Sequence, residues 1–422
     1  MKEYLEKIPE ELRGLINKVR SIAAQENLRG YLVGGFVRDL ILGVKNLDLD
    51  IVVEGDGIKF AESLGQQLKA KVIAHKQFGT ATLSLRPSLK IDFSGARSEY
   101  YPKPAHLPVV RPGSLREDLF RRDFTINAMA IDLSDGKLID YFGGASDLRN
   151  KIIRVLHDLS FIDDPTRILR AVRFEQRYSL SIERQTLSLL KSALRNKMLE
   201  QVHPHRTRDE LILILKEENV VKEIERLHKL SGLDFISAKL KINTRTRVFL
   251  KTIKKEIDWF NQRNPGRRPL DTWLVYLIGL FDPLGIREIK SICAKFGLRK
   301  GEEKRLLSYK QFKLSWVKEL SAVTIKPSRI FALLEPLSYE TILVLRSKHN
   351  NKRFKRNLAD FLEIYNGLRI YVGGEDLHCL GILPGPGYKE IFTQVLNAKL
   401  NGKVKNKEEE LELIRKLIKN RS

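Results

Sequence analysis

Two aspartates separated by one leucine, Asp48 and Asp50 in "LDLDIVV", are the residues of this chain best suited to do chemistry. If the segment is a β-strand, both carboxylates project from one face, about 6–7 Å apart along the chain. Such carboxylates repel each other unless a cation lies between them, and Mg²⁺ prefers oxygen ligands of this kind together with substrate phosphates. The pattern predicts a magnesium site; solvated aspartates on an exposed hairpin are the alternative.

A glycine pair precedes these aspartates. The segment "YLVGG" reads as a strand that ends in Gly34 and Gly35, and "FVRDLILG" continues as a short helix that carries Arg38. A strand–glycine–helix junction lets backbone N–H groups approach an anion at the helix N-terminus, although Gly–Gly turns are also common without a ligand. Because the junction comes shortly before Asp48 and Asp50, the two patterns together indicate a nucleoside triphosphate bound with Mg²⁺.

The charge of the chain points to a polyanionic partner. The 422 residues include 76 Lys and Arg against 52 Asp and Glu, a net charge of +24, which favours nucleic acid first and an anionic membrane surface second. No apolar run approaches the roughly 20 residues that a membrane helix needs, so we expect no membrane span. Two cysteines are too few for a disulfide framework or a cysteine zinc site, which fits a reducing cytoplasm.

The elements that must position these residues fall into two parts. Before about residue 140, six runs predict strands: "YLVGG", "LDLDIVV", "KVIAH", "TATLSL", "LKIDFSG" and "NAMAIDL". From about residue 150 onward, apolar residues recur with a helical period. The expected fold class is α+β, with a mixed sheet and helices followed by an all-helical remainder.

An arginine-rich helix is expected in "DDPTRILRAVRFEQR", beginning near Pro165 because proline after aspartate suits the first helical turn. Its arginines at positions 167, 170, 173 and 177 recur every three or four residues and share one face. Unpaired arginines on one face repel each other. We therefore expect a polyanion or an acidic partner there.

A proline-rich segment, "RSEYYPKPAHLPVVRPGS" (Arg97–Ser114), is expected to lie outside sheets and helices, since proline lacks a backbone donor. A loop of this length in a compact domain is usually functional or disordered.

The order of these motifs resembles the class II tRNA nucleotidyltransferases, the CCA-adding, CC-adding and A-adding enzymes related to bacterial poly(A) polymerase. Four segments carry the resemblance: "GGFVRDLILG…LDLD", "EDLFRRDFTINAMAID" (Glu117–Asp132), "YFGGASDLRNKIIRVLHD" (Tyr141–Asp158) and "DDPTRILRAVRF" (Asp163–Phe174). It is strong to about residue 220 and loose beyond. It implies a polymerase β-type nucleotidyltransferase head (1–145), a neck with the base-reading helix (146–215), a helical body (216–340) and a helical, tRNA-binding tail (341–422).

The resemblance also implies roles for single residues. Asp48 and Asp50 match the carboxylates that hold two Mg²⁺ ions, and Asp92 in "LKIDFSG" is the candidate for a third catalytic carboxylate, or a solvated aspartate that ends a strand. Residues matching the triphosphate and sugar contacts are Gly34, Gly35, Arg38, Arg122, Asp123 and Asn127. Arginine suits phosphate, whereas aspartate and asparagine suit sugar hydroxyls.

Base selection is implied for Asp164 and Arg167, with Arg170 and Arg173 nearby as further ligands. Cytosine and adenine each present an exocyclic amino donor beside a ring-nitrogen acceptor, which a carboxylate and a guanidinium complement. Uracil and guanine would leave polar groups unpaired, and such mismatches discriminate strongly. One departure from the family pattern is visible, because its usual Glu–Asp pair is Asp163–Asp164 here.

The expected enzyme transfers AMP from ATP to the 3′ end of tRNA in an Mg²⁺-dependent reaction. The long Arg97–Ser114 segment favours A-adding over CC-adding activity, and full CCA addition from CTP and ATP is the main alternative. Poly(A) polymerase comes next, and a non-catalytic tRNA-binding module is the alternative from another class. Basic segments such as Arg305–Leu320 and Arg346–Asn357 are expected to bind tRNA at its acceptor and TΨC arms in the cytoplasm.

Overall fold

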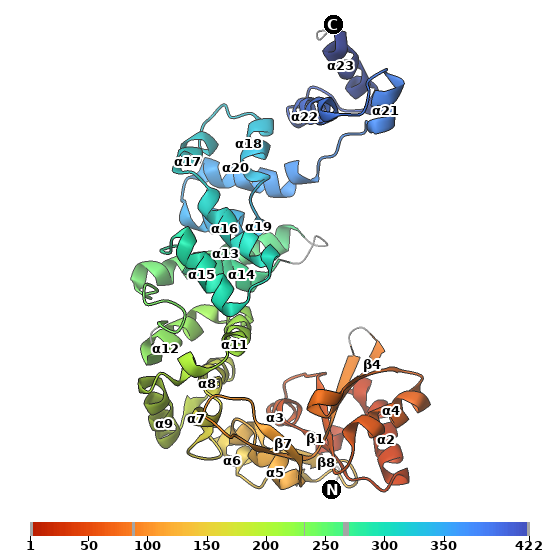
Figure 1. Cartoon of the computed structure of the whole chain (residues 1–422), viewed down its shortest axis with the longest axis vertical. Helices are drawn as coiled ribbons and strands as arrows, with labels where there is room; N and C mark the ends of the chain where they lie inside the picture. The colour runs from red at the N-terminus through yellow and green to blue at the C-terminus, as the bar shows by residue number, and fades with distance from the viewer. Residues whose placement is uncertain (1–2, 87–88, 232, 265–269, 420–422) are drawn as a thin grey trace. The chain divides into compact units, whose positions relative to one another are not determined.

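The computed structural model describes residues 3–86, 89–231, 233–264 and 270–419 (Figure 1). The chain divides into two compact units, Met1–Ser231 and Gly232–Ser422. The first unit contains a sheet with helices, and the described part of the second contains helices and no strand. This is the predicted α+β class. The finer division into head, neck, body and tail stays a prediction.

The sheet of the first unit has seven strands in the order β3-β4-β5-β2-β1-β8-β9. Their bounds are β1 (Gly30–Val33), β2 (Leu49–Val53), β3 (Lys71–His75), β4 (Thr80–Arg86), β5 (Leu89–Gly95), β8 (Ala130–Asp132) and β9 (Leu138–Ile139). β2 and β5 are parallel, whereas the other neighbours are antiparallel. All six predicted strands are therefore confirmed.

The helices of the first unit are α1 (Glu3–Glu6), α2 (Glu10–Gln25), α3 (Gly35–Leu42), α4 (Gly57–Leu68), α5 (Leu115–Phe120), α6 (Gly144–Arg149), α7 (Ser160–Asp163), α8 (Arg167–Arg177), α9 (Arg184–Arg195), α10 (Met198–Gln201), α11 (Pro204–Lys216) and α12 (Val220–Ser231). Short 3₁₀ turns are η1 (Lys76–Phe78) and η2 (Thr125–Asn127), and β10 (Ile152–Ile153) pairs in parallel with β11 (Ser181–Ile182). Helix α4 packs on β4 and β5, with α2 beside it (Figure 1).

An apolar cluster joins the central strands to α5. Tyr31 and Val33 of β1, Val52 of β2 and Leu115 and Leu119 of α5 are all nearly inaccessible to solvent. Burial of each such side chain contributes about 1.5–3 kcal/mol, so this cluster fixes β1 and β2 against α5. The polar ends of β1 and β2 then lie at the edge of a rigid core.

The proline-rich segment differs from expectation. Rather than lying wholly outside sheets, it forms a separate two-stranded sheet from β6 (Arg97–Tyr100) and β7 (Val109–Pro112). The prediction was wrong because both strands of a two-stranded ribbon are edge strands. At an edge, proline is tolerated since its missing N–H is not required for pairing with a neighbouring strand. Pro112 stands at the end of β7, opposite Arg97, and the other prolines lie in the connection between the strands.

The arginine-rich helix starts later than expected. It was expected near Pro165, but α8 begins at Arg167. The Asp164 carboxylate accepts hydrogen bonds from the backbone N–H and the hydroxyl of Thr166, at 3.0 and 2.6 Å. The backbone bonds that follow, Arg167 to Asp164 and Ile168 to Pro165, span three residues, so a tight turn precedes the α-helix.

The second unit contains α13 (Thr244–Arg263), α14 (Thr272–Leu280), α15 (Ile286–Phe296), α16 (Lys300–Gln311), α17 (Leu314–Leu320), α18 (Pro327–Leu334), α19 (Tyr339–Lys348), α20 (Lys352–Glu363), η3 (Tyr365–Gly367), α21 (Gly374–Cys379), α22 (Pro386–Leu400) and α23 (Lys407–Lys419). Helix α14 is apolar all round because α13, α16 and α19 surround it. Across the described residues, none of the helices combines the length and apolar character needed to cross a bilayer.

Candidate active site

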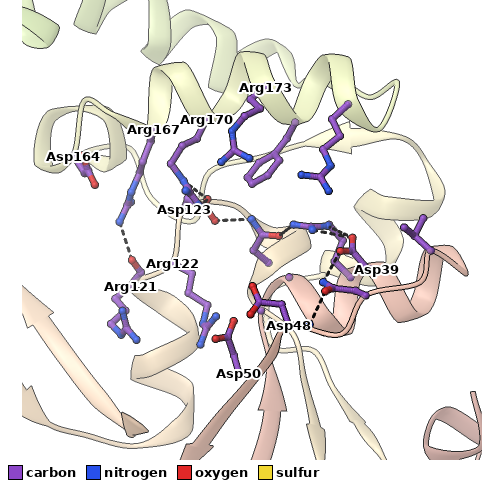
Figure 2. Close-up of a pocket in the computed structure, with 18 of the residues that line it drawn as sticks. Asp39, Asp48, Asp50, Arg121, Arg122, Asp123, Asp164, Arg167, Arg170 and Arg173 are labelled. Atoms are coloured by element: carbon purple, nitrogen blue, oxygen red, sulfur yellow. Dashed lines mark hydrogen bonds and ion pairs between the residues drawn. The ribbon is translucent and has the colours of Figure 1, made fainter. Parts of the chain in front are cut away.

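A polar cavity of about 580 Å³ opens in the first unit between β2, α3 and α8. Figure 2 shows it with α8 on one side and the strand ends on the other. Twelve of the thirteen predicted site residues line it: Gly34, Gly35, Arg38, Asp48, Asp50, Arg122, Asp123, Asn127, Asp164, Arg167, Arg170 and Arg173. The remaining residue, Asp92, does not. The structure thus brings the predicted set together, while the role of each residue stays a prediction.

Gly34 occupies a position that only glycine fits. Its φ of +70° lies in the left-handed region, and a Cβ there would come within 2.7 Å of the Arg122 guanidinium. The same Cβ would lie 3.6 Å from a carboxylate oxygen of Asp50. A side chain would therefore clash with Arg122, and its absence keeps the Gly34 backbone open beside both charged groups.

The two aspartates reach the cavity from different backbone settings. Asp50 lies within β2, whereas Asp48 precedes its first residue, Leu49. Figure 2 shows both carboxylates pointing into the same cavity, with Arg122 beside Asp50. Burial raises the pKa of Asp50 to about 6, with Arg122 opposing the rise and Asp48 and Asp92 adding to it.

Asp92 lies next to Asp50 on the neighbouring parallel strand, where the two residues are registered partners. Its side chain is exposed, and its carboxylate accepts a hydrogen bond of 2.5 Å from the Thr82 hydroxyl. Asp92 therefore adds negative charge near Asp50 without lining the cavity. Its assignment as a third catalytic carboxylate stays a prediction.

The carboxylates of Asp48 and Asp50 fit a divalent cation shared with phosphate. Among the described residues, no group of three or more His, Cys, Asp or Glu side chains could hold a metal by itself. Mg²⁺ commonly uses one or two protein carboxylates and takes its other ligands from substrate phosphates and water. The raised pKa of Asp50 indicates that a positive charge beside it would be favourable.

Arg38 is buried and tightly held. Its guanidinium donates to Asp39 at 2.9 Å, to Asn127 at 2.6 Å and to the hydroxyl of Tyr178 at 2.5 Å. It also lies over the ring of Tyr178, 4.5 Å from the centroid, and over Phe174, at 5.2 Å. Such a fixed cation presents positive charge to the cavity at a defined place.

Arg122 lies beside a second cation, Arg121, and both bind the fully buried Asp118, at 2.9 and 2.7 Å respectively. Burial raises the pKa of Asp118, but the two arginines outweigh it and the net shift is downward. Arg121 also pairs with Glu99 of β6 at 2.9 Å. The negative charge of Asp118 thus fixes Arg122 close to Gly34 and Asp50.

Asp123 and Asn127 are joined to each other and to α8. The Asn127 amide donates to Asp123 at 2.8 Å, and Arg170 binds the same carboxylate at 2.6 Å. Burial raises the pKa of Asp123, but Arg170 and Asn127 outweigh it and lower the value to about 2. The carboxylate stays ionised and can accept hydrogen bonds from sugar hydroxyls.

The arginines of α8 are not unpaired, and that part of the prediction was wrong. Glu210 of α11 binds Arg170 at 3.0 Å and Arg173 at 3.4 Å. Glu217, which follows α11, lies 3.6 Å from Arg173 and 3.4 Å from Arg177. The acidic partner belongs to the chain itself: Glu210 of α11 and Glu217 just after its end face the arginine face of α8.

The expected base-reading pair is also bound within the protein. Asp164 pairs with Arg206 of α11 at 2.8 Å. Arg167 donates to the Ser160 hydroxyl at 2.6 Å and to the backbone oxygen of Arg121 at 2.8 Å. Figure 2 shows Arg167 lying between α8 and Arg121. These contacts fix the direction of both side chains.

Sequence reasoning missed several residues that line the cavity: Asp39, Asn46, Glu99, Tyr101, Arg121 and Phe174. Tyr101 donates to Glu99 at 3.3 Å, so the β6–β7 segment supplies part of the wall. Burial raises the pKa of Tyr101 to about 12, with Arg167 opposing and Glu99 adding. The tyrosines of "RSEYYPKP" were a visible signal, but spacing alone did not place them near Arg167.

Comparison with known proteins gives a consistent result. Residues 30–154 match the model of the poly A polymerase head domain. An A-adding tRNA nucleotidyltransferase of Halalkalibacterium halodurans is 34% identical over 96% of this chain and 92% of its own length. One of Geobacter sulfurreducens is 37% identical over 96% of this chain, and this chain spans only 47% of that protein's length.

Solved structures show the same likeness. A CCA-adding enzyme in apo form II has a TM-score of 0.78 at 35% identity, covering 97% of this chain and 96% of its own. A CCA-adding enzyme in complex with ATP has a TM-score of 0.76 at 32% identity, covering 98% and 97%. The CCA-adding enzyme of Thermotoga maritima complexed with tRNA has a TM-score of 0.72 at 32% identity, covering 99% and 98%.

Proposed function

This chain belongs to the tRNA nucleotidyltransferase family, and we propose that it adds AMP from ATP to the 3′ end of tRNAs that end in CC. One observation carries the proposal: a single cavity is lined by the carboxylates of Asp48 and Asp50, by a glycine turn suited to phosphate, and by the side chains of Asp164 and Arg167. Relatives named A-adding, similar over 96% of this chain, support the choice of AMP.

In this reaction the 3′-hydroxyl oxygen of the tRNA forms a bond to the α-phosphorus of ATP. The bond from that phosphorus to the bridging oxygen breaks, pyrophosphate leaves, and the hydroxyl proton passes to solvent. Asp48 and Asp50 would hold Mg²⁺, which lowers the pKa of the attacking hydroxyl and stabilises the charge on the leaving phosphates. The backbone at Gly34 and Gly35, together with Arg38 and Arg122, orients the triphosphate.

Asp123 and Asn127 bind the ribose, since an ionised carboxylate and an amide both pair with hydroxyls. Asp164 and Arg167 read the adenine by accepting from its amino group and donating to its ring nitrogen. Arg206 and Ser160 hold these two side chains in direction, so they are ordered before the nucleotide arrives. Such order lowers the entropy lost on binding.

The tRNA itself would contact exposed basic residues of the second unit. Within the two basic segments, Arg305 pairs with Asp271 and Glu340, and Arg346 is buried against Glu256, so both stabilise the fold. The basic residues of these segments that face solvent are Lys313, Lys318, Lys348, Lys352, Arg353 and Arg356, of which Lys348 pairs with Asp282. We propose that this second unit binds the acceptor and TΨC arms of the tRNA. We also propose that the protein acts in the cytoplasm.

The proposal is tested with transcripts that end at position 73, 74 or 75, each incubated with labelled ATP or CTP and Mg²⁺. We expect one AMP on the transcript that ends in CC and no CMP on any of them. A protein with this product and no activity toward the shorter transcripts is an A-adding enzyme.

A full CCA-adding activity is the second candidate, favoured by the solved CCA-adding enzymes that share this fold. It predicts two CMP and one AMP on the transcript ending at position 73. A ladder far longer than three nucleotides would instead indicate a poly(A) polymerase. Tight tRNA binding without transfer would indicate a binding module.

A further inference from the structure

Asp48 lies outside the strand ladder that fixes Asp50. The registered pairs of β2 run from Leu49 to Val53 toward β5 and from Ile51 to Val53 toward β1, so Asp50 is held by its partner on β5. Asp48 takes part in none of these pairs. The alternation that places Asp50 in the cavity therefore does not determine where the carboxylate of Asp48 points.

Asn46 restrains the backbone of Asp48, which the strand ladder leaves unpaired. Its side-chain oxygen accepts a hydrogen bond from the backbone N–H of Asp48 at 2.8 Å, which closes a turn between α3 and β2. Its side-chain nitrogen donates to the carboxylate of Asp39 at 2.9 Å. The amide of Asn46 thus holds the backbone of Asp48 to a side chain of α3.

Asp39 is in turn tied to the end of α8. Its other carboxylate oxygen accepts from Arg38, at 2.9 Å, and from the Tyr178 hydroxyl, at 3.0 Å. Tyr178 is the residue that caps the C-terminus of α8. A continuous set of hydrogen bonds therefore runs from α8 through Tyr178, Asp39 and Asn46 to the backbone of Asp48; Figure 2 shows the part around Asp39.

We propose that Asn46 is a positioning residue that orients Asp48 for cation binding, and that Asp39 and Tyr178 link this position to α8. The inference rests on the proposed function for the identity of the cation-binding site. Asn46 touches no reacting atom in this account. It acts by holding one of the two carboxylates in a direction that the strand leaves free.

The test measures Mn²⁺ binding, by the loss of its free EPR signal, in the presence of a non-hydrolysable ATP analogue and without tRNA. Asn46→Ala should weaken Mn²⁺ binding about tenfold, as loss of a partner that orients a ligand does. Asn46→Ser, whose hydroxyl can still accept from the Asp48 N–H, should recover part of the loss. Excess Mg²⁺ should restore AMP addition by Asn46→Ala but not by Asp50→Asn.

Asn150→Ala is the matched control, because Asn150 is exposed and does not line the cavity. Equal Mn²⁺ affinity of Asn46→Ala and the unchanged protein would overturn the proposal. If Asn46→Ala fails to fold, Tyr178→Phe keeps the ring and removes the hydroxyl bound to Asp39. It should weaken Mn²⁺ binding by a smaller factor, and an unchanged affinity there would equally overturn the link to α8.

The outcomes separate this inference from the proposed function. Mn²⁺ binding that depends on Asn46, in a protein that never adds AMP to tRNA, would sustain the inference and reject the function. AMP addition to tRNA by a protein whose Mn²⁺ affinity does not depend on Asn46 would sustain the proposed function and reject the inference.

Discussion

The two sides of the cavity treat their charges in opposite ways. On the β2 side, the carboxylates of Asp48 and Asp50 accept no hydrogen bond from the described part of the chain. On the α8 side, Arg170 and Arg173 each bind a carboxylate of α11. The aspartates have no hydrogen-bonded counter-charge, although Arg122 lies beside Asp50, whereas the arginines are already paired.

This difference indicates what each side awaits. A carboxylate whose pKa is raised by burial and by neighbouring carboxylates gains stability when a cation binds, which is the behaviour expected of a metal site. Paired arginines gain less from an added anion, but they are fixed in place and lose less entropy when a ligand binds. The β2 side thus suits charge neutralisation, and the α8 side suits recognition by shape and hydrogen bonding.

The largest expected effect comes from the β2 side. Asp50→Asn should lower AMP addition about a thousandfold or more, because a metal site supplies several kcal/mol to the transition state. Binding of ATP without metal should change little, since the triphosphate and base contacts remain. Single-turnover rates and equilibrium ATP binding measure the two quantities separately, with Asp135→Asn as control, since that side chain is 40% exposed and lies outside the cavity. Comparable single-turnover rates for Asp50→Asn and Asp135→Asn would reject the assignment of Asp50 to the metal site.

On the α8 side, Arg167→Lys keeps the charge and loses the planar pair of donors. We expect kcat/KM for ATP to fall about 100-fold, or ~2.7 kcal/mol. The selectivity for ATP over CTP should also fall, by a smaller factor. Arg184→Lys on α9 is the control, being exposed and outside the cavity. Unchanged kcat/KM for both nucleotides in Arg167→Lys would show that Arg167 does not read the base.

Part of the negative charge that pairs with the arginines of α8 can be removed by mutating Glu210. Its side chain is 13% exposed, and Glu210→Gln leaves Arg170 and Arg173 with one less carboxylate. We expect the free energy of unfolding to fall by about 1–2 kcal/mol, since removing one partner of a mostly buried pair is destabilising. Thermal unfolding measures the change against Asp209→Asn, whose side chain is 61% exposed. Equal melting temperatures would mean that Glu210 does not stabilise α8.

A pH dependence is expected from Glu223 of α12, which is inaccessible to solvent and whose carboxyl oxygens bind no described group. Burial raises the pKa of Glu223 from 4.5 to about 9, with Glu217 adding and Arg173 and Arg177 opposing. Between these values the folded protein retains a proton that the unfolded chain releases, so stability falls as pH rises.

Glu223→Gln mimics the protonated form and should remove that dependence. Its melting temperature should exceed that of the unchanged protein by a margin that grows as pH rises from about 5 to about 9. The exposed Glu218→Gln should show no such trend. A margin that is constant across this range would mean that Glu223 is already ionised in the folded protein.

Much of this site followed from local sequence, because its residues lie in short motifs on neighbouring strands and turns. Strand patterns around Asp50 and the glycine pair at Gly34 predicted where phosphate and metal chemistry would meet. An acidic partner of α8 was among the expectations, but its identity was not foreseen, because Glu210 lies 40 residues beyond Arg170 and no local pattern joins the two.

Two local errors have physical reasons of the same kind. Asp48 was placed on the strand by alternation, but the turn closed by Asn46 begins before the ladder does. The segment containing Pro112 was excluded from any sheet, although an isolated ribbon tolerates proline at its edge. In both cases local hydrogen bonds that alternation and proline content do not reveal decided the structure.

The central claim is that one cavity seats the metal on the β2 side and the base on the α8 side. A crystal structure with Mn²⁺ and a non-hydrolysable ATP analogue tests it directly through the anomalous signal of manganese. The account predicts that signal beside the carboxylates of Asp48 and Asp50, with the adenine against Asp164 and Arg167. A bound analogue whose manganese lies away from both aspartates, or whose base points away from α8, would contradict it.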